Sequence, residues 1–277
     1  MPPIARKALQ AILKTLAVPA LVTLIVWLAF QLVGGEIVRA YEGPGIAEWL
    51  RRVYTSFDFG LAGEWTTSGQ SLLPYLFQAL EKTGLIALTA IIIATVFSIA
   101  WAYLTWNNPY NIFIRGGSVI LRFVSSWPIL MGAILVAVLI KGKAIASLAM
   151  PALILSTCDN NLNDFRDNLL DEINAVLKSD YAVAVMGQGR SFVRNLLPEI
   201  SWRVVSFIAS RLPAMISGII ILELYFNING IYGFLKMFYE TRDLNAILGL
   251  TFLASLFLTA WSSIFTVIHS VIDPRQR

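Results

Sequence analysis

The stretch TGLIALTAIIIATVFSIAWAYL, residues 83–104, contains no charged side chain. About 20 consecutive apolar residues suffice for a helix to cross the ~30 Å hydrocarbon core of a bilayer. Backbone N–H and C=O groups find no water inside that core, so a segment of this kind crosses it as a helix. The stretch therefore predicts an integral membrane protein built from helices.

Composition extends this prediction to the whole chain. Of its 277 residues, 57% are apolar and only 14% are charged, and the mean hydropathy is +0.70. A soluble domain has about a quarter of its residues charged. The composition thus excludes a soluble core, a disordered chain and a nucleic-acid-binding protein. The net charge of +4 fits basic loops on the cytoplasmic side of a membrane.

Uncharged or nearly uncharged stretches of spanning length predict six crossings. They are Thr15–Val33, Thr83–Leu104, Phe123–Ile140, Ala144–Cys158, Val204–Leu222 and Leu244–Ile272. Lysine and arginine are more frequent in the connections that lie inside if the N-terminus is cytoplasmic. We therefore expect a multi-pass protein of the inner (plasma) membrane, surrounded by lipid, with both termini cytoplasmic.

The expected organisation is a single transmembrane domain over residues 1–277. It has an N-terminal span at 11–33, an external loop at 34–76, a core at 77–272 and a cytoplasmic loop at about 164–203. In the external loop, apolar residues recur at helical spacing: Ile46, Trp49, Leu50, Val53, Tyr54 and Phe57. This amphipathic helix either lies in the outer membrane interface or packs on neighbouring spans.

Catalytic signatures are absent from the sequence. There is no G-x-x-x-x-G-K-[ST] phosphate loop, since Gly142-Lys143 is followed by Ala144. The single histidine, His269, and the single cysteine, Cys158, form no metal-binding or nucleophilic motif. We therefore expect no catalytic residues, no metal site and no enzymatic activity in this chain.

The cytoplasmic loop contains DYAVAVMGQGRS, residues 180–191. Its alanines and glycines would let a short helix sit closely against a partner, and Gly189 can adopt the positive φ of a turn. The segment resembles the "EAA" loop of ABC importer permeases, in the form found in the oligopeptide/dipeptide/nickel subfamily.

Other stretches resemble the same family in the same order. They are Ser56–Gly60 (SFDFG), Met150–Leu153 (MPAL), Glu223–Gly233, Arg242–Leu244 with Gly249, and Asp273–Arg277 (DPRQR). The chain departs from the family pattern at Asn229, where proline is usual, and at Leu224, where threonine is usual. Between Gly189 and Glu223 it is also about one helical turn shorter.

The resemblance implies a MetI-like ABC permease core, all-α, with a cytoplasmic coupling helix at about Gly187–Asn195. It implies a non-catalytic subunit that binds no cofactor itself. With a second permease it would form a pathway for peptides or a similar small polar solute. Two separate ATP-binding subunits would hold ATP and Mg²⁺, and an external substrate-binding protein would deliver cargo. The coupling residues would be Asp180, Tyr181, Ala182, Ala184, Gly187, Gly189, Arg190, Ser191 and Phe192.

Four residues are candidates for the pathway or its gate, each with a structural alternative. Arg211 lies within a span and either lines the pathway or forms an ion pair with Glu223 or Asp159. Glu223 and Asn227 form a gate or anchor the helix end at the interface. Asp159 lines an inner vestibule or belongs to a helix-to-loop transition.

The alternative function is a stand-alone secondary transporter or channel. That class requires several ionisable coupling groups inside the spans, and only Arg211 is clearly placed there. A scaffold or sensor protein of the membrane is a third class.

Overall fold

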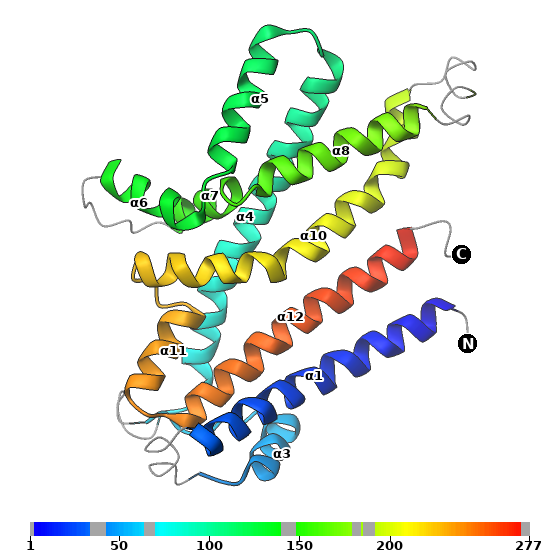
Figure 1. Cartoon of the computed structure of the whole chain (residues 1–277). Coiled ribbons are helices and arrows are strands. Elements are labelled where there is room, and N and C mark those ends of the chain that lie inside the picture. The colour runs from blue at the N-terminus through cyan, green and yellow to red at the C-terminus, as the bar shows by residue number, and fades with distance from the viewer. Residues whose placement is uncertain are drawn as a thin grey trace. The chain divides into compact units, whose positions relative to one another are not determined.

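The computed structural model describes residues 3–33, 43–63, 70–139, 148–178, 184 and 192–272. Apart from an isolated β-bridge between Leu61 and Ser71, the regular structure in these ranges is helical (Figure 1). The helices are α1 (Pro3–Val33), α3 (Ile46–Ser56), α4 (Leu73–Asn107), α5 (Ile112–Ser125), α6 (Ile129–Leu139), α7 (Ala149–Thr157), α8 (Asn161–Leu177), α10 (Phe192–Tyr225), α11 (Ile231–Glu240) and α12 (Leu244–Ile272). The prediction of an all-α membrane protein is confirmed.

Four helices in the described ranges are long and apolar enough to cross a bilayer. These spans are Ala5–Val33, Leu73–Asn107, Val204–Tyr225 and Leu244–Val271. A fifth crossing arises only if α5 and α6, which meet at an angle of 100°, count as one broken span. Within the described residues, the third expected span is a bent pair of helices, and residues 144–147 of the fourth lie outside them, so the count of six crossings stays a prediction.

The third expected span, Phe123–Ile140, is divided at Pro128. Proline has no N–H to donate to the preceding turn, and it disfavours the helical conformation of the residue before it, Trp127. The freed carbonyl of Ser125 accepts from the Asn160 N–H at 2.6 Å, and that of Trp127 accepts from the Asp159 N–H at 3.0 Å. The break is thus stabilised by backbone from the turn before α8.

In the fourth expected span, Ala144–Cys158, residues 144–147 lie outside the described residues, and the rest contains α7. This helix has 9 residues, which at about 1.5 Å per residue gives less than half the thickness of the hydrocarbon core. It packs against α6, where Gly132 approaches Cys158 so closely that a Cβ at Gly132 would lie 2.6 Å from the sulfur.

The chain forms two compact units, and α4, α10 and α12 each contribute to both. One consists of residues 1–85 and 223–264, and the other of residues 86–222 and 265–277. In the first unit, helix α3 buries Trp49 and Val53, two residues of the apolar face expected from sequence. The ring of Trp49 contacts Phe59 and Phe252 edge to face, with centroids 6.0 and 6.3 Å away. Helix α3 therefore packs on the core of its unit.

The second unit contains α5–α8 and most of α10. In Figure 1, α8 (green) and α10 (yellow) lie side by side and run in opposite directions. These two helices precede and follow the loop that resembles the coupling segment of importers, so they position the candidate site.

Candidate functional site

Most of the predicted coupling residues lie outside the described residues: Asp180, Tyr181, Ala182, Gly187, Gly189, Arg190 and Ser191. Of the other two, Ala184 is helical and exposed, and Phe192 is the first residue of α10. The structure therefore describes the helices on either side of the coupling segment, α8 and α10.

Helix α8 begins after a turn with two residues in the left-handed conformation, which asparagine and aspartate adopt more readily than other non-glycine residues. Asp159 and Asn160 both have positive φ, at 53° and 58°, a region in which asparagine and aspartate are enriched among non-glycine residues. Asp159 is exposed, and its backbone forms part of the break at Pro128. Of the two roles considered for Asp159 from sequence, this geometry fits the helix-to-loop transition.

The buried face of α8 packs through residues at helical spacing. Leu162, Phe165, Leu169 and Ile173 are all less than a tenth exposed. Their recurrence at three- and four-residue intervals is typical of an amphipathic helix. The charged residues Asp164 and Asp171 lie outside this face, on exposed positions of the same helix.

Arg211 of α10 pairs with Asp164 of α8. Its Nη2 donates to the Asp164 carboxylate at 2.7 Å, and its guanidinium lies over the Phe207 ring, 4.9 Å from the centroid. Its Nη1 also lies 3.5 Å from Oδ1 of Asn161. Neither of the partners considered from sequence, Glu223 or Asp159, is the one that Arg211 contacts here.

Aromatic stacking joins the same two helices. The rings of Phe165 in α8 and Phe207 in α10 are nearly parallel, at 9°, with centroids 3.7 Å apart. We call the set Phe165, Phe207, Asp164 and Arg211 the α8–α10 clamp. No sequence signal pairs these residues, because Asp164 and Arg211 are 47 positions apart.

Beside the clamp, α8 and α10 are separated by a groove of about 590 Å³. It is lined by Phe165, Asn168, Leu169, Asp171, Glu172, Ala175, Ser206, Phe207 and Ser210. The lining residues of α8 run from the clamp toward the C-terminal end of that helix, from which the chain continues into the coupling segment. The two helices are thus in contact at the clamp and parted by the groove next to it.

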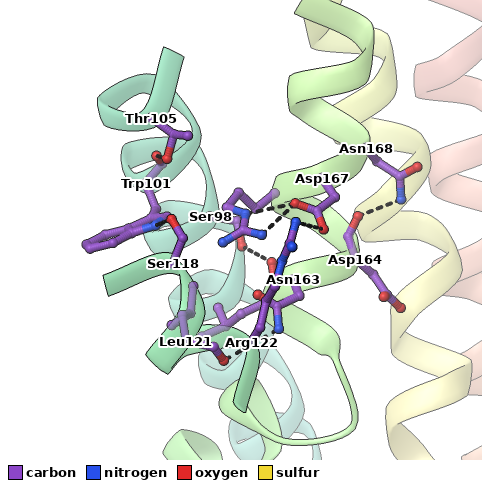
Figure 2. Close-up of polar contacts among 12 residues, drawn as sticks. Ser98, Trp101, Thr105, Ser118, Leu121, Arg122, Asn163, Asp164, Asp167 and Asn168 are labelled. Carbon is purple, nitrogen blue, oxygen red and sulfur yellow. Dashed lines mark hydrogen bonds and ion pairs between the residues drawn. The ribbon is translucent and has the colours of Figure 1, made fainter. Parts of the chain in front are cut away.

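A second polar network fastens α8 to α5 (Figure 2). Asp167 accepts from Nε and Nη2 of the buried Arg166 at 2.9 and 2.6 Å, and from Nη2 of Arg122 in α5 at 3.5 Å. A buried arginine is costly unless a carboxylate is close, and Asp167 supplies that charge. No role was assigned to Arg166 or Asp167 from sequence, because no local pattern pairs them with Arg122.

Helix α4 also contacts α8. The Ser98 hydroxyl donates to the Leu162 carbonyl at 3.0 Å, and Ala102 packs with Phe165 and Leu169 in a small buried cluster. The helix that leads into the coupling segment is therefore held by α4, α5 and α10 within one unit.

Glu223 lies in the first unit and is completely buried. Its carboxylate accepts from the Thr83 hydroxyl and from the backbone N–H groups of Tyr232, at 2.8 Å, and Gly233, at 3.4 Å. The Thr83 hydroxyl in turn accepts from the Ile231 N–H at 2.8 Å. Glu223 thus caps the N-terminus of α11, where the helix dipole favours negative charge. Burial raises the pKa of the Tyr232 phenol, and the Glu223 charge raises it further.

Asn227 ends helix α10. It has φ 51°, and the following N–H, of Ile228, donates to the Glu223 carbonyl at 2.8 Å. A helix that ends with such a bond, preceded by a left-handed residue such as Asn227, has a Schellman motif. Asparagine is the usual substitute for glycine at the left-handed position. Gly230 lies against the Glu223 carboxylate and Thr83 with no room for a Cβ. The pattern E-x-x-x-N-x-x-G at residues 223–230 therefore forms a compact turn from α10 to α11.

The four candidate pathway residues are divided between the two units. Arg211 and Asp159 belong to the second unit, and Glu223 and Asn227 to the first. In this structure, Glu223 and Asn227 have the helix-capping and helix-ending geometry described above.

A comparison with known families matches the C-terminal part of the chain. Residues 168–277 match the model of the family described as "Binding-protein-dependent transport system inner membrane component". The match covers less than half of the chain, and it includes the coupling segment and helices α10, α11 and α12. No curated protein matches the chain. Together with the apolar helices, the match indicates a multi-pass inner-membrane component of a binding-protein-dependent ABC importer, a family that is generally non-catalytic.

Proposed function

We propose that this chain is one permease subunit of an ATP-binding cassette importer. With a second permease, a homologue or another copy, it forms the pathway for peptides or a similar small polar solute. Two separate ATP-binding subunits hold ATP and Mg²⁺ and drive transport, and an external substrate-binding protein delivers the cargo. The observation that carries this proposal is the family match over residues 168–277, because it includes the segment that would contact the ATP-binding subunit.

The chemistry of residues 180–191 supports a coupling role. Ala182, Ala184, Gly187 and Gly189 present little side-chain bulk, so a short helix there can approach a partner closely. Helices α8 and α10 lead into and out of this segment. Movement of a docked partner would therefore reach Val204–Tyr225, the span within α10, through continuous helix.

The number of spans supports a second permease. The four or five candidate crossings among the described residues are few for a chain that would enclose a pathway by itself. The peptide assignment rests on the resemblance to the oligopeptide/dipeptide/nickel subfamily. Among the predicted pathway residues, Asp159 has an exposed side chain, which suits the lining of an inner vestibule.

The test is Gly189→Arg in the full transporter, expressed with its ATP-binding subunits. Arginine at this turn introduces bulk and charge where close docking is required. We expect uptake of a labelled peptide to be lost, and ATP-binding subunits to be absent after purification in mild detergent, while the chain remains in the membrane.

The matched control is Gly45→Arg. Gly45 has φ −57°, which arginine adopts freely, and a Cβ there meets nothing within 4 Å. Normal uptake by Gly189→Arg would contradict the proposal. Transport by the purified chain alone in vesicles would favour a stand-alone transporter instead.

A further inference from the structure

The α8–α10 clamp lies where two helices that bracket the coupling segment make contact. The Asp164–Arg211 ion pair, at 2.7 Å, and the Phe165–Phe207 stack, at 3.7 Å, come from the same two turns of each helix. Beside them, α8 and α10 line a groove of about 590 Å³. The clamp therefore fastens α8 to α10 at the edge of a space into which either helix could shift.

The clamp is also shielded more than a surface ion pair. The Arg211 side chain is 21% exposed, and Asp164 is 47% exposed. The face of Phe207 covers the guanidinium, so salt and water screen this charge less than they screen a free arginine. Removal of Asp164 would leave the Arg211 charge within an apolar span, where it is costly.

We propose that the α8–α10 clamp makes the two helices move as one body when the ATP-binding subunits close, with Arg211 as a positioning residue. This inference rests on the proposed function, since the coupling segment must dock on such a subunit. When the clamp is intact, displacement of the segment shifts α8 and α10 together. When it is broken, part of the displacement is absorbed by widening of the groove, and ATP is hydrolysed without movement of cargo.

The experiment measures cargo moved per ATP hydrolysed by the complete transporter in vesicles. The variants are Arg211→Gln, Asp164→Asn and their combination. We expect each single variant to lower this ratio roughly fivefold, the lower end of typical coupling between sites. Because both residues act through one ion pair, the double variant should be no worse than the worse single variant.

Three further variants separate positioning from general damage. Arg122→Gln removes another arginine that pairs with α8, through Asp167 at 3.5 Å, but it lies on α5 and should leave the ratio unchanged. Arg211→Lys retains the charge and should restore most of the ratio. Phe207→Leu removes the stack without leaving an unpaired charge in the span, so we expect the variant to insert normally. Because the stack is lost, its ratio should fall.

Several outcomes would overturn the clamp. One is an unchanged ratio of cargo moved to ATP hydrolysed in Arg211→Gln and Phe207→Leu. Another is a fall of this ratio in Arg122→Gln as large as that in Arg211→Gln. A third is a double variant whose ratio falls by the product of the two single falls. If the wild-type chain brings down no ATP-binding subunit, the proposed function fails and the clamp fails with it. If the wild-type transporter moves cargo at the expense of ATP and the clamp variants have the same ratio, the clamp is overturned and the proposed function stands.

Discussion

Glu223 is a buried carboxylate within an apolar span, and its hydrogen-bond partners lie in α4 and α11. It accepts from the Thr83 hydroxyl and from the N–H of Tyr232 and Gly233. An ionisable residue in such a position suggests a pathway or gate from sequence. Its contacts give it the position of a cap that joins α4, α10 and α11 in the first unit.

Glu223→Gln should therefore lower stability. The glutamine NH₂ would face either the Thr83 hydroxyl or the backbone N–H groups of α11, leaving buried donors unsatisfied at a cost of about 1–3 kcal/mol. The measurement is the thermal unfolding midpoint of the purified protein in detergent.

Glu240→Gln is the matched control for this substitution. Glu240 ends the same helix, α11, but its side chain is 63% exposed and lies 3.9 Å from Lys236. Exposed ion pairs contribute about 0–1 kcal/mol, so the midpoint should hardly change. Equal shifts for the two variants would show that capping of α11 does not explain the role of Glu223.

At the scale of elements, the pair α6–α7 depends on the absence of a side chain at Gly132. A Cβ there would lie 2.6 Å from the Cys158 sulfur and 3.1 Å from Cγ2 of Ile154. A Cβ essentially never lies within 3.0 Å of another non-bonded heavy atom. A side chain at position 132 would therefore require α6 and α7 to separate. Cys158 is 4% exposed and is the single cysteine of the chain.

Gly132→Ala should increase the rate at which a membrane-permeant thiol reagent labels Cys158. Overpacking of about 1–3 kcal/mol raises the population of open states by roughly 5- to 150-fold. Gly116→Ala is the control, because a Cβ at Gly116 meets nothing within 4 Å. Slow labelling in both variants would mean that the α6–α7 packing accommodates a Cβ at position 132 without opening, which would contradict this prediction.

For the whole molecule, the number of crossings decides whether the two termini lie on the same side of the membrane. Four full-length spans return the chain to the side where it started, provided that residues 108–203, between the second and third spans, make no net crossing. The 100° bend between α5 and α6 and the 9 residues of α7 fit a segment that enters and returns. A fifth crossing would place the termini on opposite sides.

We expect reporters fused to the N-terminus and the C-terminus to be active on the cytoplasmic side in both cases. A reporter placed at Ser179, in the connection after α8, should give the same result, since the proposed ATP-binding subunits are cytoplasmic. Opposite results for the two termini would identify α5 and α6 as one broken crossing and refute this topology.

Much of the fold was predictable because the deciding signals are local. The spans at Thr15–Val33, Thr83–Leu104, Val204–Leu222 and Leu244–Ile272 all fall within long helices, since apolar length alone requires a helix in lipid. The spacing of Trp49 and Val53 likewise indicated an amphipathic helix where α3 lies. The third expected span contains Pro128, and the described part of the fourth contains the short α7. Apolar content alone indicates neither the break nor the helix length.

Amino-acid order alone was enough to identify a helical membrane protein and, through residues 168–277, the kind of transport component that it matches. Other features depend on contacts between distant segments. Whether Pro128 kinks or breaks a helix depends on the Asp159 and Asn160 N–H groups that take up the freed carbonyls. Whether Arg211 faces a pathway or a partner depends on Asp164, on another helix. Apolar length and periodicity are properties of neighbouring residues, whereas hydrogen bonds and ion pairs between distant segments arise only when folding brings them together.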